Sequence, residues 1–137
     1  EPDQNPIEEV DEIECVAAKG IRGDRFFEFK EDYKGQVTFF DIAVYERLCE
    51  KFEVSHLGPD VFRRNIITEG QDLNALIDQH FTIQGVEFFG TQEAKPCYWM
   101  NRAFAEGAEE AMMGNGGLRA RILSDGFIRA DHALVTT

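Results

Sequence analysis

The stretch FRRNIITEGQDLNALIDQHFTIQGVEFF, residues 62–89, carries the pattern that decides the fold. The runs 62–68, 81–83 and 86–89 are rich in the aromatic and β-branched residues typical of strands. Turn residues separate these runs, and one short stretch at 73–77 has helical spacing. Short strands without long helices between them argue against a doubly wound parallel sheet. We therefore expect a mainly β fold with short helices, in the form of a small β-barrel.

The rest of the chain repeats this pattern on both sides. Further strands are predicted at residues 13–17, 36–40, 118–122 and 127–129. Asp41 is a plausible N-cap for a first helix, and a second helix is predicted over 97–113, ending at Gly114. Asp125-Gly126, between the last two strands, is a strong signal for the turn of a β-hairpin.

Composition and charge limit the kinds of molecule that this chain can bind. The chain has 137 residues, of which 43% are hydrophobic, and this suits one domain with one core. Acidic side chains crowd residues 1–11, so we expect a flexible acidic arm there, followed by the barrel domain over 12–137. The net charge of −12 argues against nucleic acid as a partner, because phosphates require lysine and arginine. No apolar run approaches the roughly 18 residues of a membrane span, so we expect no membrane partner.

The cysteines are few and widely spaced. Cys15, Cys49 and Cys97 form neither a CxxC pair nor a Cys/His zinc pattern. Their odd number favours a reduced chain and predicts a cytoplasmic location. Cys15 lies in an apolar strand-like run and Cys49 near the end of the first predicted helix, so both are interpreted as structural.

Cys97 differs because it follows Lys95 and Pro96 at the predicted start of a helix. Positive charge and helix N-terminal amides lower the pKa of a thiol in such a position. The thiolate that results is the form that attacks electrophiles and binds metals. The alternative is a small buried residue in the first turn of the helix.

Two further segments are candidates for an anion site. Arg63-Arg64-Asn65 places two guanidinium groups at the start of a predicted strand, and the guanidinium fork matches phosphate or carboxylate. Because successive strand residues face opposite sides, we expect one arginine to hold the anion and the other to face solvent or a carboxylate. A surface salt bridge is the alternative. The loop 20–25 is interpreted as a turn closed by the Asp24 side chain.

Six segments, taken in order and spacing, resemble the MOSC domain, which is named after the C-terminal part of molybdenum-cofactor sulfurase. They are GIRGDR (20–25), QVT (36–38), RRNI (63–66), GQDL (70–73), FTIQG (81–85) and KPC (95–97). The closing GGLRARIL (116–123) and GFI (126–128) look like the last hairpin of the family. The resemblance covers about residues 12–135 and implies a barrel-like, mostly β fold.

The resemblance also implies a function. Relatives bind the pterin-based molybdenum cofactor (molybdopterin) with one cysteine thiolate as a molybdenum ligand, and some reduce N-hydroxylated compounds such as amidoximes. By position, Cys97 would be both the metal ligand and the catalytic residue. The matching segments would bind the cofactor through Asp24, Arg25, Arg63, Arg64, Asn65 and Lys95.

The implied partners are a small-molecule substrate and, for a reductase, a separate electron-donor protein, because no iron–sulfur or flavin motif is present. Two other functions remain open. Some relatives have been proposed to carry sulfur as a persulfide for metal–sulfur cluster assembly. A non-catalytic module that binds a small anion is the third possibility.

Overall fold

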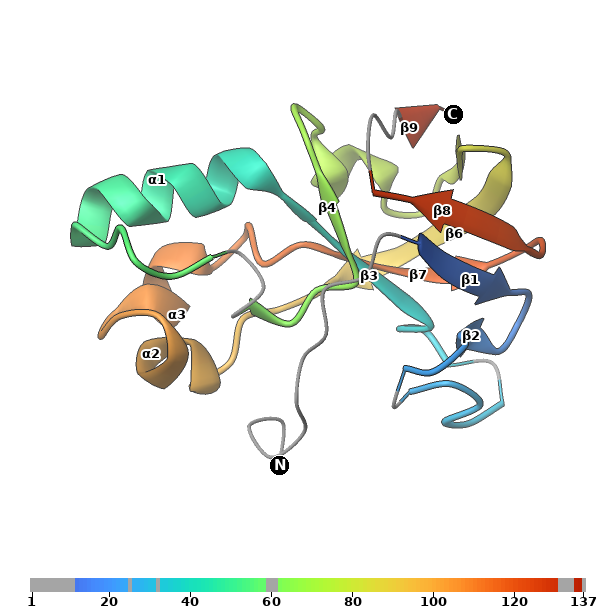
Figure 1. Cartoon of the computed structure of the whole chain (residues 1–137), viewed down its shortest axis with the longest axis horizontal. Coiled ribbons are helices and arrows are strands. Elements are labelled where there is room, and N and C mark those ends of the chain that lie inside the picture. The colour runs from blue at the N-terminus through green and yellow to red at the C-terminus, as the bar shows by residue number, and fades with distance from the viewer. Residues whose placement is uncertain (1–11, 25, 32, 59–61, 131–134, 137) are drawn as a thin grey trace.

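Two β-sheets form the framework of the protein (Figure 1). The computed structural model describes residues 12–24, 26–31, 33–58, 62–130 and 135–136, so the acidic arm expected at 1–11 lies outside the described residues. The strands are Glu12–Val16 (β1), Gly20–Ile21 (β2), Val37–Asp41 (β3), Ile66–Thr68 (β4), His80–Ile83 (β5), Val86–Glu93 (β6), Leu118–Ile122 (β7), Gly126–Arg129 (β8) and Val135–Thr136 (β9).

The larger sheet has six strands in the order β4-β3-β7-β6-β5-β9 and curls into a half-barrel. Its β3–β4 pair is parallel and its other pairs are antiparallel. The smaller sheet has three antiparallel strands in the order β2-β1-β8. The predicted mainly β fold with short helices is confirmed.

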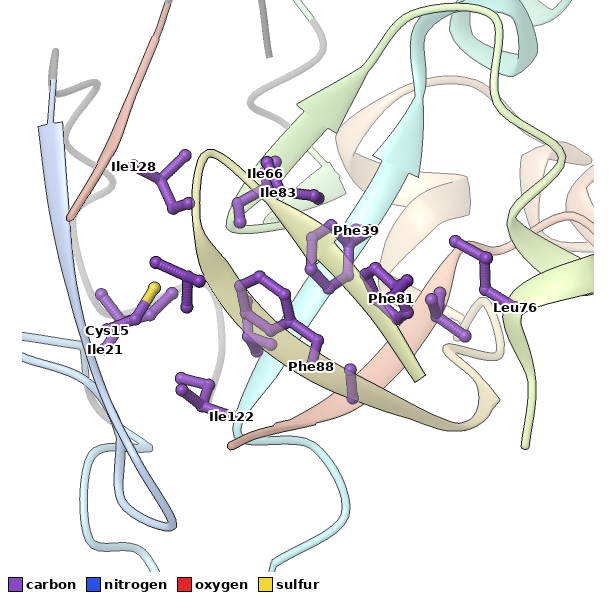
Figure 2. Packing of buried hydrophobic residues seen from close by; sticks show 14 of the residues in the cluster. Cys15, Ile21, Phe39, Ile66, Leu76, Phe81, Ile83, Phe88, Ile122 and Ile128 are labelled. Atoms are coloured by element: carbon purple, nitrogen blue, oxygen red, sulfur yellow. The ribbon is translucent and has the colours of Figure 1, made fainter. Parts of the chain in front are cut away.

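The main apolar core lies between the two sheets (Figure 2). The small sheet contributes Cys15, Ile21 and Ile128 to it, and the large sheet contributes side chains such as those of Phe39 and Phe88. Cys15 is fully buried there, as expected of a structural cysteine. Burial raises the pKa of its thiol to about 12, because an apolar core disfavours the thiolate.

Three α-helices cover a second, smaller core, and one short 3₁₀ helix adds Leu73 and Leu76 to the main core. They are Ile42–Phe52 (α1), the 3₁₀ helix Leu73–Leu76 (η3), Trp99–Ala103 (α2) and Ala108–Met112 (α3). The N-cap predicted at Asp41 is confirmed, because its Oδ2 accepts a hydrogen bond of 3.2 Å from the Ala43 N–H. The apolar side chains between α1, α2, α3 and β3 are Phe40, Leu48, Phe62, Met100, Phe104, Ala108 and Met112. No helix among the described residues is long and apolar enough to cross a membrane.

The single helix predicted over 97–113 is wrong in its extent. The helical structure begins at Trp99 and breaks between α2 and α3, where Gly107 has φ 93°. This left-handed conformation favours glycine and interrupts the helix. A Cβ at Gly107 would lie 3.4 Å from the ring of Phe52, an ordinary contact, so the backbone conformation and not crowding is the reason for the glycine.

The hairpin predicted around Asp125-Gly126 is also wrong. The strand β7 pairs with β3 and β6, whereas β8 crosses to the small sheet and pairs with β1. Asp125 accepts a hydrogen bond of 2.7 Å from the Ala17 N–H, which ties this crossing to the small sheet. A Cβ at Gly126 would lie 2.6 Å from Cγ2 of Val86. This glycine is therefore needed for a close approach to β6 and not for a hairpin turn.

Candidate functional site

Cys97 lies in the connection between β6 and α2, and its side chain is exposed. Its carbonyl oxygen accepts a hydrogen bond of 2.9 Å from the Met100 N–H, which starts the turn that leads into α2. The thiol is therefore open to solvent, and the alternative of a buried residue in a helix is wrong.

The guanidinium of Arg64 joins three separate segments of backbone beside Cys97. Its Nε donates to the Gly116 carbonyl at 2.9 Å, and its Nη1 donates to the Phe62 carbonyl at 3.1 Å. Its Nη2 donates to the Ala94 carbonyl at 2.9 Å. Hydrogen bonds from a charged donor are stronger than neutral ones, so Arg64 holds the start of the Cys97 connection in place.

The pKa of Arg64 shows which charges lie close to it. Burial lowers this pKa to about 10, because a buried guanidinium loses its hydration. Negative charge on Cys97 acts in the opposite direction, Arg119 lowers the pKa further by repulsion, and Glu93 raises it. One buried arginine is thus coupled to the exposed thiol, to a second arginine and to a carboxylate.

Two glycines let the chain pass next to the Cys97 connection. A Cβ at Gly116 would lie 2.2 Å from the Ala94 carbonyl oxygen and 2.7 Å from Cδ of Pro96. A Cβ at Gly117, which has φ 114°, would lie 2.2 Å from the Phe39 carbonyl oxygen. The sequence reading placed these glycines in a hairpin, whereas they bring the backbone before β7 against the segment that carries the thiol.

Asn65 and Asp24 are brought together, and both anchor backbone. Oδ1 of Asn65 accepts hydrogen bonds from the Thr38 N–H at 2.8 Å and from its hydroxyl at 3.0 Å. Nδ2 of Asn65 donates to Oδ1 of Asp24 at 3.3 Å, while Oδ2 of Asp24 accepts from the Phe26 N–H at 3.0 Å. The interpretation of Asp24 as a turn-closing residue is confirmed. Arg25, the next predicted site residue, lies outside the described residues.

Arg63 and Lys95 complete the set predicted from the sequence. The guanidinium of Arg63 lies 5.8 Å from the ring centroid of Trp99, near the start of α2. The strand predicted over 62–68 begins only at Ile66, so the alternation expected for Arg63 and Arg64 does not apply to them. Arg63 instead has φ 58°, which turns the backbone between the two side chains. Lys95 is exposed.

The model of the MOSC domain family matches residues 28–135 of the chain. The chain belongs to the MOSC domain family. This MOSC domain also resembles solved structures at low identity. The YuaD protein from Bacillus subtilis has a TM-score of 0.76 at 17% identity, with 89% of this chain and 82% of that chain covered.

Two YiiM proteins share the fold over part of their length. YiiM from Escherichia coli has a TM-score of 0.70 at 20% identity, with 93% of this chain and 62% of that chain covered. YiiM from Geobacillus stearothermophilus has a TM-score of 0.66 at 14% identity, with coverages of 75% and 54%. This MOSC domain thus spans little more than half the length of the YiiM chains. No curated protein sequence matches it. At these identities the structural likeness shows the fold alone.

Three of the segments that carry the family resemblance meet at the connection that holds Cys97 in this MOSC domain. Residues 62–65, 94–97 and 116–117 meet through the hydrogen bonds of Arg64 and the contacts of the two glycines. Within the described ranges, no group of three or more His, Cys, Asp and Glu side chains gathers to hold a metal ion. Sequence reasoning missed Glu93, because strand position alone does not show which carboxylate lies near Arg64.

A cavity of about 480 Å³ lies elsewhere, between α1 and α3. Its lining residues are Val44, Arg47, Leu48, Glu50, Lys51, Ala111 and Asn115. None of the predicted site residues lines it, and its lining carries no thiol. We therefore place the candidate site at Cys97 and not in this cavity.

Proposed function

We propose that this MOSC domain binds the pterin molybdenum cofactor through the Cys97 thiolate and reduces N-hydroxylated small molecules. The observation that carries the proposal is the exposed Cys97 side chain on a connection to which the half-buried Arg64 is hydrogen-bonded at Ala94. The connection that carries this exposed thiol is held at its start by the hydrogen bond of Arg64 to the Ala94 carbonyl, which makes Cys97 a positioned ligand and not a mobile one.

The residues around Cys97 suit this cofactor chemically. A thiolate is a soft donor of the kind that molybdenum accepts, and the cofactor phosphate suits guanidinium groups. Arg64 uses three of the five N–H donors of a guanidinium on backbone, so its main part in this proposal is to hold the Cys97 connection. When bound, the cofactor supplies the oxygen-atom chemistry. Cofactor contacts of Asp24, Arg25, Arg63, Asn65 and Lys95 remain predictions from the family resemblance.

Reduction of an N-hydroxyl group consumes two electrons and two protons and releases water. In this proposal the electrons come from a separate electron-donor protein, and the substrate reaches the centre from the solvent side on which Cys97 is exposed.

Metal and pterin analysis tests the proposal. The protein and its Cys97→Ala variant are produced in a host that makes the molybdenum cofactor, and molybdenum and pterin are measured per chain. Cys49→Ala is the matched control, because this half-buried cysteine lies on α1. We expect metal and amidoxime reduction in the wild type and the control, and loss of both in Cys97→Ala. Full metal retention in Cys97→Ala would sink the proposal.

Persulfide transport is a second candidate function, because the same exposed thiol is open to a protein partner that delivers or removes sulfur. Intact mass spectrometry of metal-free protein would then show one additional sulfur atom, lost on reduction and missing in Cys97→Ala. Binding of a small anion without either sulfur chemistry would leave an unmodified thiol and no molybdenum.

A further inference from the structure

The cavity between α1 and α3 is a candidate for a second binding site. Its volume of about 480 Å³ lies within the range of roughly 300–1,000 Å³ that is typical of small-molecule pockets. One wall is a single face of α1, because the four main lining residues are spaced three, four and seven positions apart along the helix. These residues are Val44, Arg47, Leu48 and Lys51.

The opposite wall of the cavity is held in place by its backbone. It consists of Ala111 in α3 and Asn115 shortly after that helix. The N–H of Asn115 donates to the Met112 carbonyl at 2.7 Å. The carbonyl of Gly114 accepts a hydrogen bond of 2.8 Å from Nδ2 of Asn74 in η3. The cavity is therefore formed between two elements of fixed position.

The two cations that line the cavity have no acidic partner among the described side chains. The ion pairs among those side chains are Lys19–Glu28, Arg22–Glu14 and Arg129–Glu12. Neither Arg47 nor Lys51 takes part in one of them. Glu50 also lines the cavity, and it forms no ion pair with either cation. The lining thus carries two cations against one carboxylate, an excess of positive charge in a chain of net charge −12.

The spacing of the two cations favours an anion between them. Arg47 and Lys51 are one helical turn apart, and like charges at this spacing destabilise a helix. Lys51 lies in the last turn of α1, where a cation also stabilises the helix dipole, and its Nζ lies 5.8 Å from the centroid of the Phe52 ring. Arg47 lies one turn earlier and lacks this role. An anion bound to both cations would relieve their repulsion.

We propose that this cavity is a binding site for a small carboxylate with an apolar body. The carboxylate contacts the guanidinium of Arg47 and the ammonium group of Lys51, because a guanidinium fork matches a carboxylate and an ammonium group adds a second charged donor. The apolar body lies on the side chains of Val44, Leu48 and Ala111. None of the residues assigned to the Cys97 site lines the cavity, so the inference is independent of the proposed function.

A series of probe molecules separates the charge from the apolar body in the wild type. Octanoate, octanol, octylammonium and acetate are titrated into the full chain, and backbone amide signals are followed by NMR. We expect octanoate to shift the signals of α1 and of residues 108–115 and to bind about fivefold or more tightly than each of the others. Equal binding of octanol or octylammonium would overturn the proposal, and so would shifts that map away from the cavity.

Charge removal at the exposed position Arg47 identifies the carboxylate contact. Arg47→Gln should weaken octanoate binding about fivefold, the effect of one charged partner in a partly solvated site, and Arg47→Lys should retain most of the affinity. The matched control is Arg102→Gln, which removes an exposed charge from α2 outside the cavity and should bind octanoate as the wild type does. An unchanged affinity in Arg47→Gln, or an equal loss in Arg102→Gln, contradicts the proposal.

Discussion

Nη2 of Arg64 donates a hydrogen bond of 2.9 Å to the carbonyl oxygen of Ala94, three residues before Cys97. This contact joins an arginine at the entry to β4 with the end of β6, thirty residues away in the sequence. The position of the thiol is therefore set by a side chain that need not touch any ligand.

Replacement of Arg64 by methionine should destabilise the fold strongly. The variant removes donors from three backbone carbonyls, and we expect a loss of about 3 kcal/mol in the free energy of unfolding. Urea unfolding measures it, with Arg47→Met on the exposed side of α1 as control, expected to change by less than about 0.5 kcal/mol. Equal midpoints for the two variants would show that the Arg64 bonds contribute nothing.

Gly116→Ala should disturb the Cys97 connection, because its Cβ would lie 2.2 Å from the Ala94 carbonyl oxygen. We expect a loss of at least about 2 kcal/mol, as for other forced overpacking, and a changed alkylation rate at Cys97. Gly114→Ala is the matched control, because its Cβ meets nothing within 4 Å and only its φ of 85° opposes the change. That control should cost about 1 kcal/mol and leave Cys97 reactivity as in the wild type. Equal unfolding free energies and equal Cys97 alkylation rates in the two variants would contradict the close approach of Gly116 to Ala94.

Exchange of the amide and the carboxylate tests the hydrogen bond between Asn65 and Asp24. Asn65→Asp keeps the acceptor for Thr38 but places a second carboxylate against Asp24, so stability should fall by about 1–2 kcal/mol. The double variant Asp24→Asn with Asn65→Asp restores one donor and one acceptor, and it should recover most of that loss. Thermal unfolding at neutral pH measures all three proteins. Additive losses in the double variant would mean that the two side chains are not coupled.

Alkaline pH should destabilise the protein partly through Cys15. The folded-state pKa of this thiol is raised from 9.0 to about 12, so above pH 9 the unfolded chain releases a proton that the folded chain keeps. The free energy of unfolding is unaffected by this thiol below pH 9. It falls by at most about 1.4 kcal/mol per pH unit as the pH rises from 9 towards 12. Urea unfolding at pH 8 and pH 10 should show a shallower decline in Cys15→Ala than in the wild type. Cys49→Ala should keep the slope of the wild type.

Local signals in the sequence predicted most of the fold. The cap at Asp41, the strand alternation over 118–122 and the turn at Gly85 each depend on neighbouring residues only, and each is confirmed. Asp125-Gly126 failed because the same dipeptide serves a close contact with Val86, which no local pattern reveals.

The site could be predicted only in part for the same reason. The family segments identify Cys97 and Arg64, and the structure brings them together. The acceptors of Arg64 are backbone carbonyls at Ala94 and Gly116, 30 and 52 residues away, and a carbonyl has no sequence signature. Arg119 likewise occupies a polar position of an alternating strand. Its hydrogen bond with Tyr33, 86 residues away, has no signature in the sequence.

The pairing of β1 with β8 has a consequence for how the domain is made. Glu12 pairs with Arg129, so the small sheet joins residues 117 positions apart in the sequence and raises the contact order of the fold. During synthesis β1 leaves the ribosome early and waits for its main partner until almost the whole domain has emerged. We therefore expect strands β3, β5, β6 and β7 of the large sheet to pair before the small sheet closes over Cys15.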